Sequence, residues 1–87
     1  MAIFNGNRCE VEIIYDILSF AQDDIKKTRL LYRTNLSYNN FNKYLNFLIE
    51  KKFLGAKIGN PSGKMYYTTE KGKNLFDSIQ DVIYKLK

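Results

Sequence analysis

Apolar residues recur at helical spacing on both sides of a short polar link, and this pattern organises the centre of the 87-residue chain. The segment before the link, Arg29–Arg33, is barely two turns long, whereas Tyr38–Lys52 after it is long enough for a full helix. In the longer segment Phe41, Leu45 and Leu48 share one face, which we expect to point into a core. The opposite face carries hydrogen-bonding groups without negative charge: Asn39, Asn40, Asn42, Lys43 and Asn46.

The link has the residues that a tight turn between two helices needs. Asn35 tolerates the left-handed backbone conformation, much as glycine does. Ser37 is suited to cap the second helix, because its hydroxyl can accept a hydrogen bond from the backbone amide of Asn39 or Asn40. A short helix, a tight turn and a longer helix with a polar face predict a helix-turn-helix, which is a binding device and not a catalytic one.

The flanking segments predict the rest of a mainly helical α+β domain. A broad apolar stripe predicts a helix over Cys9–Gln22, and residues 25–27 predict a very short strand before Thr28 caps the next helix. A strand starting at Phe53-Leu54, turn residues at 59–63 and a returning strand over Lys64–Thr68 predict a β-hairpin with a basic tip. The hairpin completes a winged helix-turn-helix of three helices and a wing over residues 1–68.

The last segment, residues 69–87, predicts a further helix. Thr69 is suited as its cap, and an α-helix over Glu70–Lys87 would be about 27 Å long. Its aliphatic residues are four, three and four positions apart, as in the seam of a coiled coil, and Phe76 and Ile83 widen the stripe enough to dock the helix on its own domain. Because a helix of this length is marginal alone in water, we expect the seam to pack against a second copy of the chain. The expected dimer interface comprises Leu75, Ile79, Val82, Ile83 and Leu86; the alternative is a helix that folds back within one chain.

Composition excludes several classes of site. The chain has no histidine, which removes triads with a histidine base, zinc fingers and most metal sites. Neither enzymatic activity nor a cofactor or metal is therefore expected. The single cysteine, Cys9, has no partner for a disulfide and is expected to be a small, partly buried hydrophobe. No apolar run approaches a membrane span and the first residues do not resemble a signal peptide, so a cytoplasmic, nucleoid-associated location without membrane contact is expected.

Positive charge is concentrated on the helix-turn-helix and the wing. From Lys26 to Lys64 nine lysines and arginines stand against Glu50 alone, a net charge of +8, whereas the two flanks together carry −3. A solvated basic face is one explanation for such a run. Its coincidence with a helix-turn-helix favours a polyanionic partner.

Three stretches carry a family resemblance: KTRL at Lys27–Leu30, YRTNLSY at Tyr32–Tyr38 and KYL at Lys43–Leu45. In them the chain resembles archaeal winged helix-turn-helix proteins, in particular small dimeric DNA-binding proteins of Sulfolobus-type archaea whose last helix forms an antiparallel coiled coil. The stretch YYTTEKG at Tyr66–Gly72 is similar to the Y-x-L-T-E-K-G of many winged-helix regulators, with Thr68 in place of Leu. The resemblance runs from about Arg8 onward. It implies a homodimer that binds double-stranded DNA, as a transcriptional regulator or an architectural chromatin-type protein.

Residue types on the helix-turn-helix and wing indicate the contacts that DNA would receive. The helix over Tyr38–Lys52 is expected to enter the major groove with its amino end first. Asparagine amides pair bidentately with adenine, so base contacts are predicted for Asn39, Asn40 and Asn42. Hydroxyls, cations and wing groups hold the phosphate backbone, and these contacts are predicted for Arg29, Arg33, Ser37, Tyr38, Lys43, Asn60 and Lys64. A hairpin that only covers the core is the alternative for the wing.

Two other functions remain open from the sequence. A protein-interaction adaptor is the rival, because winged helices also serve in that role and the chain has candidate interface residues in Tyr15, Tyr38 and Tyr84. RNA binding is weaker, because the deep, narrow major groove of A-form RNA excludes a helix.

Overall fold

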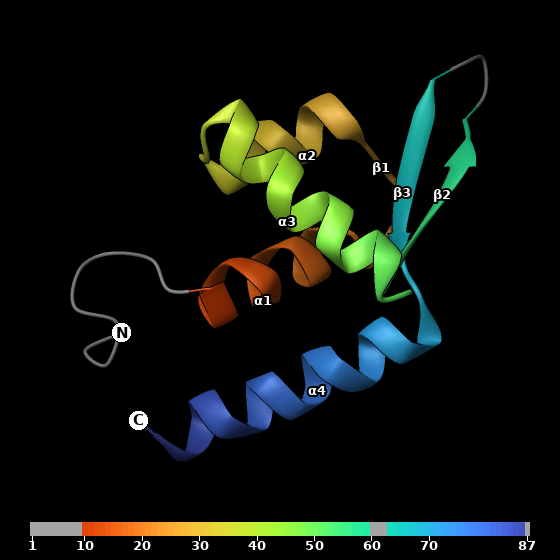
Figure 1. The fold of residues 1–87 in the computed structure, drawn as a ribbon. Coiled ribbons are helices and arrows are strands. Elements are labelled where there is room, and N and C mark those ends of the chain that lie inside the picture. Colours follow the sequence, from red (N-terminus) through yellow and green to blue (C-terminus); the bar gives the residue numbers. More distant parts are fainter. Residues whose placement is uncertain (1–9, 60–62, 87) are drawn as a thin grey trace.

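The computed structural model describes residues 10–59 and 63–86, and the described elements form the predicted mainly helical α+β fold. Their order along the chain is α1 (Glu10–Phe20), β1 (Ile25–Lys26), α2 (Lys27–Thr34), α3 (Tyr38–Glu50), β2 (Leu54–Ile58), β3 (Lys64–Thr68) and α4 (Glu70–Lys85) (Figure 1). The arrangement is that of a winged helix-turn-helix followed by one further helix. The fold class that the sequence predicts is therefore confirmed.

The sheet is small and antiparallel, with strand order β1-β3-β2. β2 and β3 form the predicted hairpin, in register from Leu54 opposite Thr68 to Ile58 opposite Lys64. β1 adds two residues to the other edge of β3, with Ile25 opposite Tyr66. The hairpin stands beside α2 and α3, so its strands hold the wing next to the helix-turn-helix (Figure 1).

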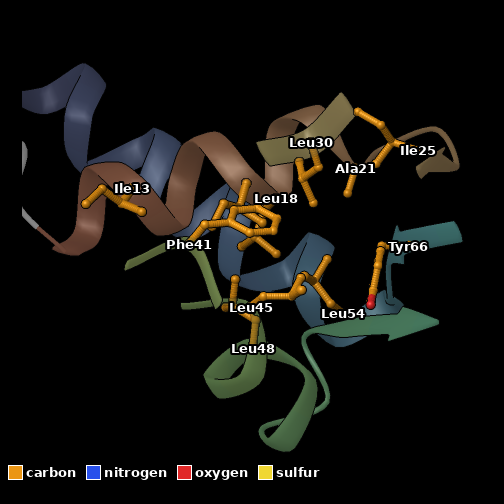
Figure 2. Packing of buried hydrophobic residues seen from close by; sticks show 11 residues of the cluster. Ile13, Leu18, Ala21, Ile25, Leu30, Phe41, Leu45, Leu48, Leu54 and Tyr66 are labelled. Carbon is orange, nitrogen blue, oxygen red and sulfur yellow. The ribbon is translucent and has the colours of Figure 1, made fainter. Parts of the chain in front are cut away.

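The core lies between α1, α2, α3 and the root of the hairpin. As predicted, Phe41, Leu45 and Leu48 turn one face of α3 inward, toward Leu18 of α1 (Figure 2). Buried Thr68 ties the sheet to α1, because its hydroxyl and its backbone N–H donate to the carbonyls of Leu18 and Ala21, each at 2.8 Å. Every described element except α4 contributes a buried side chain to this core or its polar ties, so the position of α3 is fixed from several sides.

The turn between α2 and α3 is built as the sequence predicts. Asn35 is left-handed, with φ 57°, and its N–H donates to the carbonyl of Tyr32. The Ser37 hydroxyl accepts from the backbone N–H of Asn40 at 3.3 Å and caps α3. The prediction of Thr28 as the cap of α2 is wrong: the helix begins at Lys27, directly after Lys26, which still pairs in β1.

The end of α3 and the start of α4 meet at one junction. Two residues after α3, Lys52 adopts a left-handed conformation with φ 68°, and the N–H of Phe53 then donates back to the carbonyl of Leu48 at 2.9 Å. The Thr69 hydroxyl donates to the carbonyl of Lys52 at 2.7 Å and accepts from the N–H of Gly72 at 3.0 Å, which confirms Thr69 as the cap of α4. The chain therefore passes from α3 to α4 through a bonded corner.

α4 lies alongside α1 and runs in the opposite direction (Figure 1). The ring of Phe76 stacks on Tyr15 of α1, with the centroids 4.7 Å apart and the planes 10° from parallel. The predicted docking of α4 through Phe76 is confirmed. Leu75, predicted to belong to the exposed seam, is instead half-buried and packs against the core.

Candidate nucleic-acid interface

The amino end of α3 presents exposed polar groups and no carboxylate. Tyr38, Asn39 and Asn40 are exposed in the first turn, which contains no acidic residue, and Lys43 follows on the next turn. The helix dipole adds partial positive charge at this end. A surface of amides, a phenol and an ammonium group, with this dipole behind it, is suited to bind an anion that carries hydrogen-bonding groups.

Three side chains from α2 and α3 form a polar group at this end, which we call the Tyr38 cluster: Lys27, Tyr38 and Asn42. The ammonium of Lys27 lies 5.5 Å from the centroid of the Tyr38 ring. A side-chain hydrogen bond from Asn42, followed by the charge of Lys27 and a hydrogen bond from it, holds the pKa of Tyr38 below its usual value. Each of these contacts favours the phenolate over the phenol. The cluster thus brings the cation of Lys27 next to two predicted DNA contacts.

Lys27 is absent from the predicted DNA contacts, and the structure places it beside Tyr38, which is one of them. It precedes Tyr38 by eleven positions, so the sequence gives no local spacing that joins the two residues. Their approach depends on the angle at which α2 crosses α3. The signal in the sequence was the basic run itself, in which Lys27 is one of nine cations.

The three asparagines predicted to read bases do not form a single row. Asn42 belongs to the Tyr38 cluster and is partly buried. Asn40 instead lines a groove of about 510 Å³ between α3 and α1, which Lys43 and Glu10 of α1 also line. At 100° per residue, Asn39 and Lys43 lie between these two sides of the helix. In the first two turns of α3 the most outward part therefore carries the amide of Asn39 and the ammonium group of Lys43, and Asn46 continues it on the next turn.

The two arginines of α2 lie outside the Tyr38 cluster. The guanidinium of Arg33 is over the ring of Phe20 of α1, 5.5 Å from its centroid. Arg29 lines a shallow pocket with Asp24 and Met65, next to β1 and the wing. Both side chains are exposed, and their predicted phosphate contacts remain a prediction.

The wing carries two described lysines with different surroundings. The ammonium of Lys57 is 2.6 Å from a carboxylate oxygen of Asp24 and lies over the ring of Tyr67. Lys64 is exposed opposite Ile58 at the far end of the hairpin. Asn60, the remaining predicted wing contact, lies outside the described residues.

The predicted dimer seam is divided along α4. Leu75 packs on the core, and Ile79 and Ile83 are half-buried. Val82 and Leu86 are 55% and 54% exposed, so the apolar surface that is free for a partner lies in the second half of the helix. Its role in dimerisation remains a prediction.

The described part of the chain shows neither a metal site nor a membrane span. Over residues 10–59 and 63–86, no three cysteine or acidic side chains are grouped to hold a metal ion. In the same ranges no helix is long and apolar enough to cross a bilayer.

Sequence comparison gives a family and two archaeal relatives. The family model described as "Winged helix-turn-helix" matches residues 7–87. The chain is 33% identical to protein MJ0287 of Methanocaldococcus jannaschii over 76 residues, which are 86% of this chain and 73% of that protein. It is 30% identical over 76 residues to MJ0290 of the same organism, again over 86% of this chain, which there spans about a third (34%) of the relative.

Solved structures show the same fold. Sso10a-2, a DNA-binding protein from Sulfolobus solfataricus, is 35% identical with a TM-score of 0.77, over 88% of this chain and 80% of that protein. F93 from STIV, a winged-helix DNA-binding protein, is 25% identical with a TM-score of 0.72, over 92% of this chain and 95% of that protein. SSV1 F-93, at 24% identity and a TM-score of 0.71 over 91% of each chain, is similar in fold. The predicted resemblance to archaeal winged-helix proteins is confirmed, and the chain belongs to the winged helix-turn-helix family.

Proposed function

We propose that this protein binds double-stranded DNA as a homodimer, with the amino end of α3 in the major groove, and acts as a transcriptional regulator or an architectural protein of the nucleoid. The observation that carries the proposal is the Tyr38 cluster at a capped helix end whose first turn contains no carboxylate. That Sso10a-2 and F93 from STIV are DNA-binding proteins supports it.

We infer different tasks for the residues of α3 from their positions around the helix. Asn39 and Lys43 lie on the most outward part of the helix, so the amide of Asn39 is the first candidate to reach a base edge and Lys43 a phosphate at the groove wall. Lys27 adds a cation at the amino end of α3. Asn42 is hydrogen-bonded to Tyr38 within the cluster. Its amide would have to give up this bond before it could contact a base.

The second half of α4 supplies the proposed contact between two copies. Val82 and Leu86 are exposed aliphatic side chains on a helix whose other face is already docked on α1. A two-fold pairing through this half would present two α3 helices to one duplex. Wing residue Lys64 would give each copy a second phosphate contact.

Fluorescence anisotropy on labelled duplexes tests this function. If Lys27, Lys43 and Lys64 of each copy neutralise phosphates, the dimer makes six such contacts and the slope of log affinity against log salt is about −5. Affinity should then fall by roughly a thousandfold between 50 and 200 mM salt. A regulator prefers particular genomic fragments over random DNA, and an architectural protein binds both alike. Absence of binding at low salt contradicts the proposal and supports the adaptor alternative.

A further inference from the structure

The two faces of the wing hairpin have different chemistry at its far end. Successive residues of a strand point to opposite faces, so Leu54 and Ile58 share a face of β2. Their partners across the hairpin are Thr68 and Lys64. Because Leu54 and Thr68 are buried, this is the face that continues the core, and the pair Ile58–Lys64 extends it beyond the core into solvent.

The opposite face is held by contacts within the protein. Lys57 and Met65 are directly opposed on it. The ammonium of Lys57 is tied to the carboxylate of Asp24, in the turn before β1, and lies 5.7 Å from the centroid of the Tyr67 ring. The charge of Lys57 is therefore paired within the protein, whereas Lys64 is the lysine on the face that continues the core.

Ile58 is unusual for the end of a basic hairpin. Its side chain is 75% exposed, the largest exposure of a valine, leucine or isoleucine in the described residues. A single exposed aliphatic residue on a protein surface is ordinary. This one, however, is paired with a lysine at the far end of the wing, on the face of the hairpin that also carries the buried residues Leu54 and Thr68.

An apolar side chain has few partners on a duplex. Phosphates attract Lys64 and do not attract Ile58, which is left with sugar faces, thymine methyl groups or the space between two stacked bases. With α3 in the major groove, a hairpin beside it faces the adjoining minor groove, where proteins insert aliphatic wedges between base steps and bend the helix axis.

We propose that Ile58 is such a wedge: it enters the minor groove at the edge of the site, with Lys64 on a neighbouring phosphate, and bends the duplex. This inference rests on the proposed function. Pyrimidine–purine steps unstack most easily, so a TA step under the wing should be preferred to a stiff A-tract, without a hydrogen bond to either. The wing would then select for a deformable base step, which is a DNA feature that α3 does not contact.

The test measures bending separately from binding. A duplex of about 30 base pairs, labelled at both ends for energy transfer, is titrated with the full-length protein while anisotropy follows binding. Wild type should shorten the end-to-end distance. Ile58→Asn should bind about tenfold more weakly and leave the saturated duplex straight, because the buried aliphatic contact is lost. Ile58→Leu, which keeps an aliphatic wedge, should bend the duplex as wild type does.

Val11→Asn is the matched control, because Val11 is another exposed aliphatic residue, 48% exposed, on α1. It should bind and bend as wild type does. Bending by Ile58→Asn equal to wild type, or a straight duplex under saturating wild type, overturns the wedge and leaves the proposed DNA binding standing. No anisotropy change for wild type at low salt contradicts the proposed function itself.

Discussion

Replacing Lys27 by methionine tests the Tyr38 cluster as a DNA-binding element. Lys27 is half-buried in the first turn of α2, and its ammonium lies over the Tyr38 ring at the amino end of α3. Methionine keeps the length and the apolar stem of the side chain and removes the charge. The fold should tolerate it, because a cation in the first turn of a helix opposes the helix dipole.

The expected magnitude follows from counterion release. One phosphate contact contributes about −0.9 to the salt slope, so a dimer that loses two should show a slope less steep by about 1.8. The affinity defect of Lys27→Met should then shrink by roughly tenfold between 50 and 200 mM salt. Anisotropy titrations at several salt concentrations measure both quantities.

Lys73→Met is the control for net charge. Lys73 is exposed near the start of α4, and the substitution removes the same charge away from the amino end of α3. Equal salt slopes for Lys27→Met and Lys73→Met would refute a phosphate contact by Lys27 and leave only a general effect of charge. The same Lys27→Met variant should also raise the pKa of Tyr38, because one of the groups that lower it is removed.

Three further outcomes are expected. Gly72→Ala should destabilise the protein by about 1–3 kcal/mol and lower its melting temperature by roughly 10 °C, because a Cβ there would collide with the carbonyl oxygen of Phe53. The control Ser78→Ala, on the exposed side of α4, should leave thermal unfolding unchanged. Since the pKa of Tyr38 is lowered, its phenolate should form, and weaken DNA binding, at a lower pH than an ordinary tyrosine would allow. Tyr38→Phe should abolish this loss of affinity with rising pH, and an unchanged loss in the variant would contradict the role of Tyr38. Val82→Asp should convert a dimer to a monomer in light scattering at tens of micromolar, whereas Val82→Leu should not; a wild-type monomer at that concentration would disprove the proposed dimer.

The sequence predicts the elements whose signals are local. The apolar period of α3, the left-handed turn at Asn35 and the cap at Ser37 all depend on residues within four positions of one another, and the structure confirms them. Thr69 as the cap of α4 is confirmed for the same reason. The start of α2 is the exception, because the pairing of Lys26 with Met65 sets where the strand ends, and Met65 is far along the chain.

The features that the sequence missed come from tertiary geometry. The approach of Lys27 to Tyr38 depends on how α2 crosses α3. The contact between Lys57 and Asp24 spans the sheet, since β3 lies between β1 and β2, and no short spacing announces it. Leu75 fits a coiled-coil seam by periodicity, but the docking of Phe76 on Tyr15 turns that part of α4 toward the core.

The junction between α3 and α4 has a consequence for how two copies would meet DNA. Thr69 and Lys71 bind carbonyls at the end of α3, Lys71 through its ammonium 2.9 Å from the carbonyl oxygen of Lys51, and Gly72 admits the backbone of Phe53. These contacts restrict the rotation of α4 relative to α3. In the proposed dimer the distance between the two α3 helices, and their relative rotation about the DNA axis, are therefore set by the protein. Inserting half a helical turn, about five base pairs, between two half-sites would move one of them to the far side of the duplex, where a rigid pair cannot follow.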